Sequence, residues 1–105
     1  MSDTKKPPPP PRHLDASTRK WWTHVCSTYE LAEHHVRILA LACQAWDRAE
    51  EARQRLAKDG TIYIDRFGAP RKHPSVSVEE QARLAFARLI AQLDLEGESN
   101  PLYRR

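Results

Sequence analysis

One long helical run, from about residue 33 to 59, constrains the fold more than any other feature of this chain. In its first half the apolar residues recur three or four positions apart, which places them on one helix face; they are Val36, Leu39, Ala40, Cys43 and Trp46. Charged residues crowd the second half, and Gly60 provides the usual stop. About 27 residues would form a rod about 40 Å long. A chain of 105 residues makes one small domain, so we expect the far half of the rod to be available to another subunit or partner.

A shorter helix is predicted before the rod, from Ala16 to about Tyr29, with Asp15 as its N-cap. It carries two adjacent tryptophans, Trp21 and Trp22, which cannot both point to the centre of one face. One should lie in the core and the other at its flank, where it could anchor an interface. The short link at residues 31–32 favours an antiparallel or sharply crossed helix pair.

A third helix is predicted near the C-terminus, ending at about residue 94 or 95. Ser77 and Glu80 have the spacing of a capping box, although Ser75 is an alternative cap. The predicted apolar face comprises Val78, Ala82, Ala85, Phe86, Leu89 and Leu93, with Ile90 at its edge. Its small alanines would let another helix approach closely.

Residues 60–74 separate the second and third helices and favour a small, irregular β-hairpin. Residues 61–64 are strand formers, and residues 65–68 have the composition of a turn. Two strands alone are marginally stable, so we expect Ile62, Ile64 or Phe67 to pack on a helix or on a neighbouring subunit.

The predicted fold is therefore mainly α, with three helices and a hairpin between the second and third. Residues 1–13 contain five consecutive prolines and should form a disordered basic arm, residues 14–95 a helical domain, and residues 96–105 a flexible tail. No apolar run is long enough to span a membrane, and no signal peptide is recognisable. With Cys26 and Cys43 on apolar faces, buried free thiols are expected, which indicates a cytosolic protein.

The net charge of +3 is unevenly distributed. Residues 1–13 and residues 60–74 each carry a net charge of +2, whereas the helices are balanced or slightly acidic. Local basic clusters attract polyanions such as nucleic acid, although solvated Lys and Arg are common on any surface. The candidate DNA-binding residues are Lys5, Lys6, Arg12, Arg19, Lys20, Arg66, Arg71 and Lys72.

No catalytic or metal-binding pattern is recognisable in the sequence. The three glycines do not form a phosphate-binding loop. His34 and His35 are adjacent on a helix and lack the spacing of a helical metal pair. Asp65 and His73 are only weak evidence for acid–base catalysis, because no third catalytic residue accompanies them. We therefore predict a non-enzyme without a cofactor or metal.

An ordered series of residues resembles the phage terminase small subunits of the short family found in tailed phages. The series comprises residues 14–16, Trp22, residues 29–31, Leu39, Ala45, Trp46, Glu51, Gly60, Gly68, residues 72–74, Leu89 and residues 93–95. The most specific part is the segment after the long helix: Gly60, Gly68, Lys72-His73-Pro74 and a helix that ends with Leu89 and Leu93-Asp94-Leu95. Family members end in an "LGL"-like sequence, where this chain has Asp94 in place of the glycine.

The resemblance implies a non-catalytic packaging protein that assembles into a homo-oligomeric ring and recognises the packaging site on double-stranded phage DNA. It also implies recruitment of a large subunit that carries the ATPase and nuclease, and a location in the host cytoplasm but not in the mature virion. Two alternatives remain: a helix-turn-helix-like DNA-binding regulator, and an assembly adaptor without DNA affinity. Trp21, Trp22, Trp46 and Phe67 are the candidate interface residues. For Trp46 we prefer a place in the core, and for Trp21 and Phe67 both interpretations stay open.

Overall fold

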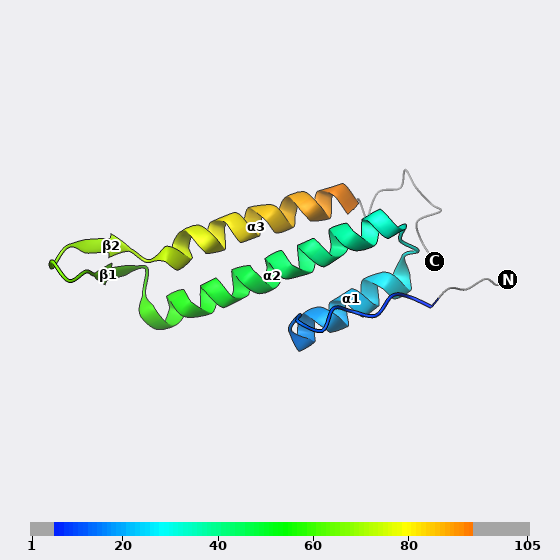
Figure 1. The fold of residues 1–105 in the computed structure, drawn as a ribbon, viewed down its shortest axis with the longest axis horizontal. Helices are drawn as coiled ribbons and strands as arrows, with labels where there is room; N and C mark the ends of the chain where they lie inside the picture. Colours follow the sequence, from blue (N-terminus) through cyan, green and yellow to red (C-terminus); the bar gives the residue numbers. More distant parts are fainter. Residues whose placement is uncertain (1–5, 94–105) are drawn as a thin grey trace.

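A computed structural model describes residues 6–93 and confirms the mainly α fold (Figure 1). The elements are α1 (Ala16–Thr28), α2 (Glu33–Asp59), β1 (Ile62–Ile64), β2 (Pro70–Lys72) and α3 (Pro74–Leu93). α3 runs back along α2, α1 flanks the N-terminal half of α2, and the hairpin projects from the far end of the α2–α3 pair. The result is an elongated molecule of 67 × 27 × 18 Å. The predicted end of the third helix, near residue 94 or 95, lies outside the described residues.

The long helix begins and ends where its sequence predicts. It stops at Gly60, which adopts a φ of 82° and donates its backbone N–H to the carbonyl of Leu56. The expectation that its far half is left open is wrong on one face, because α3 covers that face. Ala49 and Ala52 of α2 and Ala82 of α3 are buried there, and their small side chains allow the close approach.

The core lies where α1, the N-terminal half of α2 and the end of α3 meet. It consists of Leu14, Trp22, Val25, Cys26, Leu39, Cys43 and Leu93. Trp22 is 2% exposed, whereas Trp21 packs at the margin, so the prediction of one core and one flanking tryptophan is confirmed. Both cysteines are buried thiols that are not joined in a disulfide, as expected. Burial is the main cause that raises the pKa of Cys43 to about 12, so its thiol stays protonated at neutral pH.

α1 starts at the predicted residue, with Asp15 at the N-cap position as predicted, but this residue does not cap the helix through its side chain. The Asp15 side chain makes no capping hydrogen bond. Instead, the backbone N–H of Asp15 donates to Oδ2 of Asp47 at 2.9 Å, and the Thr18 hydroxyl donates to Oδ1 of the same carboxylate. The Asp47 carboxylate, in the middle of α2, therefore accepts two hydrogen bonds from the start of α1 and ties the two helices together.

Part of the proline-rich arm is attached to α1. The indole Nε1–H of the buried Trp22 donates to the carbonyl of Pro8 at 3.0 Å. A proline residue has no backbone N–H to donate, but its carbonyl oxygen can still accept a hydrogen bond. The described part of the arm, residues 6–13, therefore has a fixed contact with the core, while the proposed domain boundaries stay a prediction.

α3 begins at Pro74, which overturns the predicted caps at Ser77 and Ser75. The imidazole Nδ1 of His73 accepts the backbone N–H of Ser75 at 3.0 Å, so His73 acts as the cap. Pro74 suits the first helical position, where an N–H would be unsatisfied. The Nε2 of His73 lies 3.3 Å from a carboxylate oxygen of Asp59, and its backbone N–H donates to the carbonyl of Thr61. His73 therefore joins the base of the hairpin to the ends of both long helices.

The hairpin has the predicted turn. β1 and β2 pair antiparallel, with Ile62 opposite Lys72 and Ile64 opposite Pro70. Asp65 Oδ1 accepts the backbone N–H groups of Phe67 and Ala69, both at 2.9 Å, and Gly68 adopts a φ of 80°. The expected packing on a helix is wrong, because Ile62, Ile64 and Phe67 are 61%, 65% and 79% exposed. The alternative, a contact with another subunit, stays a prediction.

Acid should loosen the hairpin before it affects the helices. The hydrogen bond from Arg71, followed by those from the backbone of Ala69 and Phe67, lowers the pKa of Asp65. A lowered folded-state pKa contributes stability above the ordinary carboxyl range, and this stability is lost as the pH falls through the folded pKa. We expect the hairpin amides to lose protection from hydrogen exchange on acidification. In Asp65→Asn this loss should be absent, and an unchanged acid response in that variant would contradict the assignment.

Candidate functional site

The hairpin carries three exposed cations in three different environments. Arg71 pairs with Asp65 at 2.9 Å, which partly neutralises it and holds the turn. The Arg66 guanidinium lies 4.9 Å from the ring centroid of Phe67, a cation–π distance. Among residues 6–93, no carboxylate forms an ion pair with Arg66 or Lys72. These two charges are therefore available to a polyanion or to another subunit.

A second basic region surrounds α1 and the arm. Lys6, Arg12, Arg19 and Lys20 are all exposed. Within the part of the chain that the structure describes, none of them pairs with an acidic side chain. Lys5, predicted with them, lies outside the described residues.

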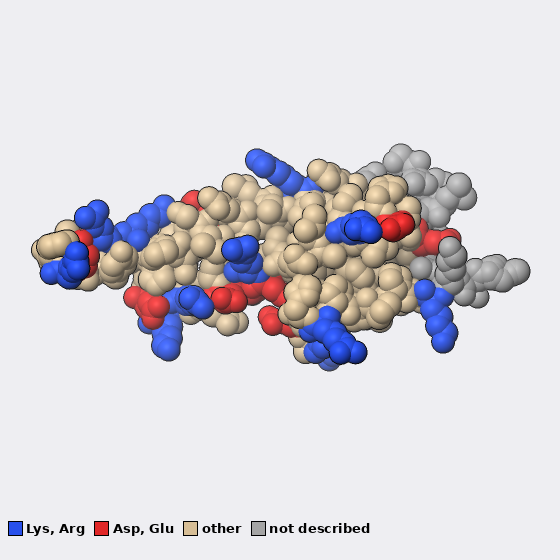
Figure 2. All heavy atoms as spheres, in the orientation of Figure 1, with Lys and Arg blue, Asp and Glu red and all other residues tan. Residues whose placement is uncertain are grey.

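The two basic regions lie apart on the face drawn in Figure 2. Figure 2 shows Lys and Arg side chains at the hairpin end and others around α1, with acidic side chains along the edge of α2 between them. The predicted DNA-binding residues are therefore brought together only partly.

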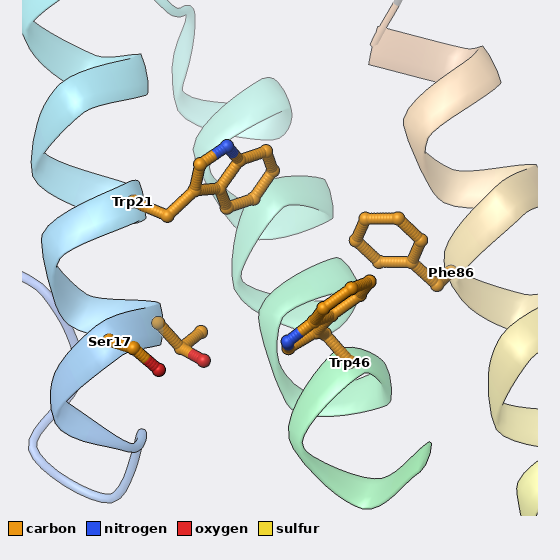
Figure 3. A pocket seen from close by; sticks show the side chains of 5 residues that line it. Ser17, Trp21, Trp46 and Phe86 are labelled. Carbon is orange, nitrogen blue, oxygen red and sulfur yellow. The ribbon is translucent and has the colours of Figure 1, made fainter. Parts of the chain in front are cut away.

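An aromatic groove lies between the three helices. It is lined by Ser17, Thr18, Trp21, Trp46 and Phe86 and has a volume of about 280 Å³. Figure 3 shows the three rings converging from α1, α2 and α3. The centroids of Trp46 and Phe86 are 5.2 Å apart, and those of Trp21 and Phe86 are 6.2 Å apart. Both distances fall within the favourable range for aromatic pairs.

The aromatic residues differ in how far they suit the predicted interface. Trp46 is 46% exposed, so its preferred assignment to the core is wrong: its helical position follows the core stripe, but it lies where the three helices diverge. Trp22 is buried and offers no side-chain surface to a partner, which removes it from the candidates.

Sequence reasoning placed Phe86 on the apolar face of the third helix and did not recognise it as part of a groove. No pattern in the sequence predicts that Phe86 lies beside Trp21 and Trp46.

The histidines and carboxylates considered from the sequence lie in separate environments. No group of three or more metal-binding side chains occurs among residues 6–93. His73 lies beside Asp59, whereas Asp65 binds Arg71, so the pair considered from the sequence does not form. Desolvation, followed by the neighbouring His34, lowers the pKa of His35. No helix in the described part of the chain is long and apolar enough to cross a bilayer.

Comparison with known proteins identifies a family. The family described as phage terminase, small subunit, matches residues 18–100, which is most of the chain. No curated protein and no solved structure matches. The match includes α1 from Thr18 onward and all of α2, the hairpin and α3.

Proposed function

Because the chain belongs to the phage terminase small-subunit family, which serves DNA packaging, we propose that it oligomerises and binds the packaging site on double-stranded phage DNA. In this proposal it also recruits and regulates the large terminase subunit, which carries the ATPase and nuclease. Small terminase subunits are generally non-catalytic. The proposed place of action is the host cytoplasm, without a membrane partner.

The observation that carries the DNA-binding proposal is the set of exposed cations without an acidic partner in residues 6–93. They are Lys6, Arg12, Arg19, Lys20, Arg66 and Lys72. Lysine and arginine side chains free of internal ion pairs are suited to displace counterions from phosphates. Arg71 is a weaker candidate than its sequence indicated, because it is already held by Asp65. Lys5 stays a prediction.

Oligomerisation would convert two small basic regions into a repeated array. Each chain contributes only a few phosphate contacts, which is weak binding on its own. Linking several such contacts on one DNA raises their effective concentration and hence the overall affinity. The described helix faces present no evident set of side chains for reading base edges, so we propose that selectivity arises from the shape and bending of DNA on the assembly.

The test is the salt dependence of binding to duplex DNA, measured by fluorescence anisotropy. Lys72→Gln, and separately Arg19→Gln with Lys20→Gln, should reduce the slope of log K against log salt by about 0.9 for each phosphate that the variant no longer neutralises. Arg55→Gln is the matched control, because Arg55 is an exposed cation that already pairs with Glu51 at 3.3 Å.

Unchanged affinity and slope in both sets of variants would refute these phosphate-binding roles. Absence of DNA retention by the wild-type protein even at low salt would favour the adaptor that lacks DNA affinity. A palindromic footprint with two half-sites would favour the helix-turn-helix regulator.

A further inference from the structure

The hairpin presents a convex apolar surface that the described chain leaves uncovered. We call Ile62, Ile64 and Phe67 the hairpin knob. Alternation along β1 places the two isoleucines on one face, and Phe67 follows in the turn. All three side chains are more than 60% exposed. A two-stranded hairpin is marginal in water without cover, so this surface would gain stability from a partner.

The aromatic groove is the concave counterpart. Its walls come from three separate helices, so its shape is set by the helix packing and not by a mobile loop. Trp46 and Phe86 also line a second hollow of about 120 Å³ towards Ala49 and Arg53, which extends the apolar surface along α2 and α3. A hollow of this kind could receive an aromatic side chain with the aliphatic residues beside it.

A chain cannot insert its knob into its own groove. Phe86 lies twelve residues after Pro74, about 18 Å back along α3. The hairpin projects from the helices in the opposite direction (Figure 1). The knob that fills the groove must therefore belong to another molecule, and a second copy of this chain supplies one.

The charges beside the two surfaces are complementary. Arg66, which stacks on Phe67, has no acidic partner among residues 6–93. Asp47 follows Trp46 in the sequence and binds Thr18 of the groove wall; no cation in the described chain pairs with it. Its carboxylate accepts hydrogen bonds only from neutral groups, the Thr18 hydroxyl and the Asp15 backbone. Placing Arg66 beside Asp47 would satisfy both charges.

We propose that the hairpin knob of one copy docks in the aromatic groove of the next, with Arg66 beside Asp47. The inference rests on the proposed oligomer and names its contact. Because knob and groove are different surfaces, the contact is heterologous and closes into a ring when the rotation between copies allows it. In this arrangement Arg66, named above among the cations available to DNA, is used by the interface, which leaves Lys72 as the unpaired hairpin cation for DNA and Arg71 as the weaker one held by Asp65.

The test is complementation between two defective variants, followed by native mass spectrometry. The knob variant carries Ile64→Ser and Phe67→Ser. The groove variant carries Ser17→Trp, which fills the groove from an exposed position without altering the core. Each variant alone should be monomeric. An equimolar mixture should form a one-to-one dimer and nothing larger, because only one intact knob meets one intact groove.

Leu41→Ser is the control, because Leu41 is an exposed apolar residue outside both surfaces, and it should keep the wild-type mass. Circular dichroism should show all variants to be folded. If either variant keeps the wild-type mass, or if the mixture stays monomeric, the proposal is overturned. It is also overturned if the groove variant assembles normally but no longer stimulates the ATPase of the large subunit, since the groove would then hold that partner.

Failure of this inference can be distinguished from failure of the proposed function. If only the contact is wrong, the wild-type protein still assembles and retains DNA at low salt. If the DNA-binding function is wrong, complementation can succeed while no variant or wild type retains DNA. Phe67→Ser, which keeps every candidate DNA-binding cation, separates the two roles: it should weaken assembly, while the salt slope per bound chain stays unchanged.

Discussion

Leu39→Ala should lower the free energy of unfolding by about 2–5 kcal/mol, the range for truncating a fully buried leucine. Leu39 is 0% exposed and lies in the core cluster that includes Trp22, Cys43 and Leu93. The change removes buried methyl groups and leaves a cavity that the three helices can close only partly. For a small domain this is a large part of a total stability of roughly 5–15 kcal/mol.

The matched control is Leu41→Ala, two positions along the same helix. Leu41 is 53% exposed, so its truncation should change stability by no more than about 0.5 kcal/mol. Urea denaturation followed by circular dichroism, at one protein concentration, compares the two variants. Equal decreases in stability would contradict the orientation of α2 and hence the position of the core.

Trp22→Ala should cost about 3–5 kcal/mol, the range for removing a buried aromatic side chain. It also removes the donor that holds the Pro8 carbonyl, so residues near Pro8 should become more accessible to protease. Trp22→Phe keeps most of the apolar ring but removes the Nε1–H. It should cost less than Trp22→Ala while still releasing the arm, because the hydrogen bond itself is worth about 0.5–1.5 kcal/mol.

Trp21→Ala is the control for this prediction. Trp21 packs against Phe86 at the margin of the core, so its truncation should destabilise the protein clearly less than that of Trp22. Thermal unfolding and limited proteolysis of the three variants provide the comparison. A larger effect at Trp21 than at Trp22 would show that the two adjacent tryptophans have exchanged roles.

The long helix was predictable because local physics determines it. A continuous stripe of apolar residues and a glycine with positive φ mark α2 with the same bounds in sequence and structure. The hairpin turn was predictable for a similar reason: Asp65 and Gly68 are residues that such a turn requires. The family resemblance, which rests on an ordered series along these elements, is also confirmed.

Features that depend on distant partners could not be predicted. The hydrogen bonds that tie the start of α1 to α2 come from Asp47, which is 32 positions from Asp15. The start of α3 depends on His73, whose imidazole accepts a backbone N–H and faces Asp59 across the hairpin base. Helix periodicity placed Trp46 on the core stripe, but its exposure depends on where α1 and α3 diverge around it.

The candidate site, too, was predictable from the sequence only in part. The basic residues could be named from the sequence, but their separation into two regions and the pairing of Arg71 with Asp65 required the structure. The aromatic groove was not predictable, because its three rings come from three helices. Because the structure shows both this groove and the uncovered hairpin, the general expectation of oligomerisation becomes a proposal for a specific contact.

Native mass spectrometry of the wild-type protein, with and without a short duplex, tests the central claim most directly. The account predicts one discrete assembly of several copies that retains the duplex at low salt and releases it as salt rises. A protein that stays monomeric at all concentrations and leaves the duplex unbound would contradict the proposed oligomeric DNA-packaging subunit.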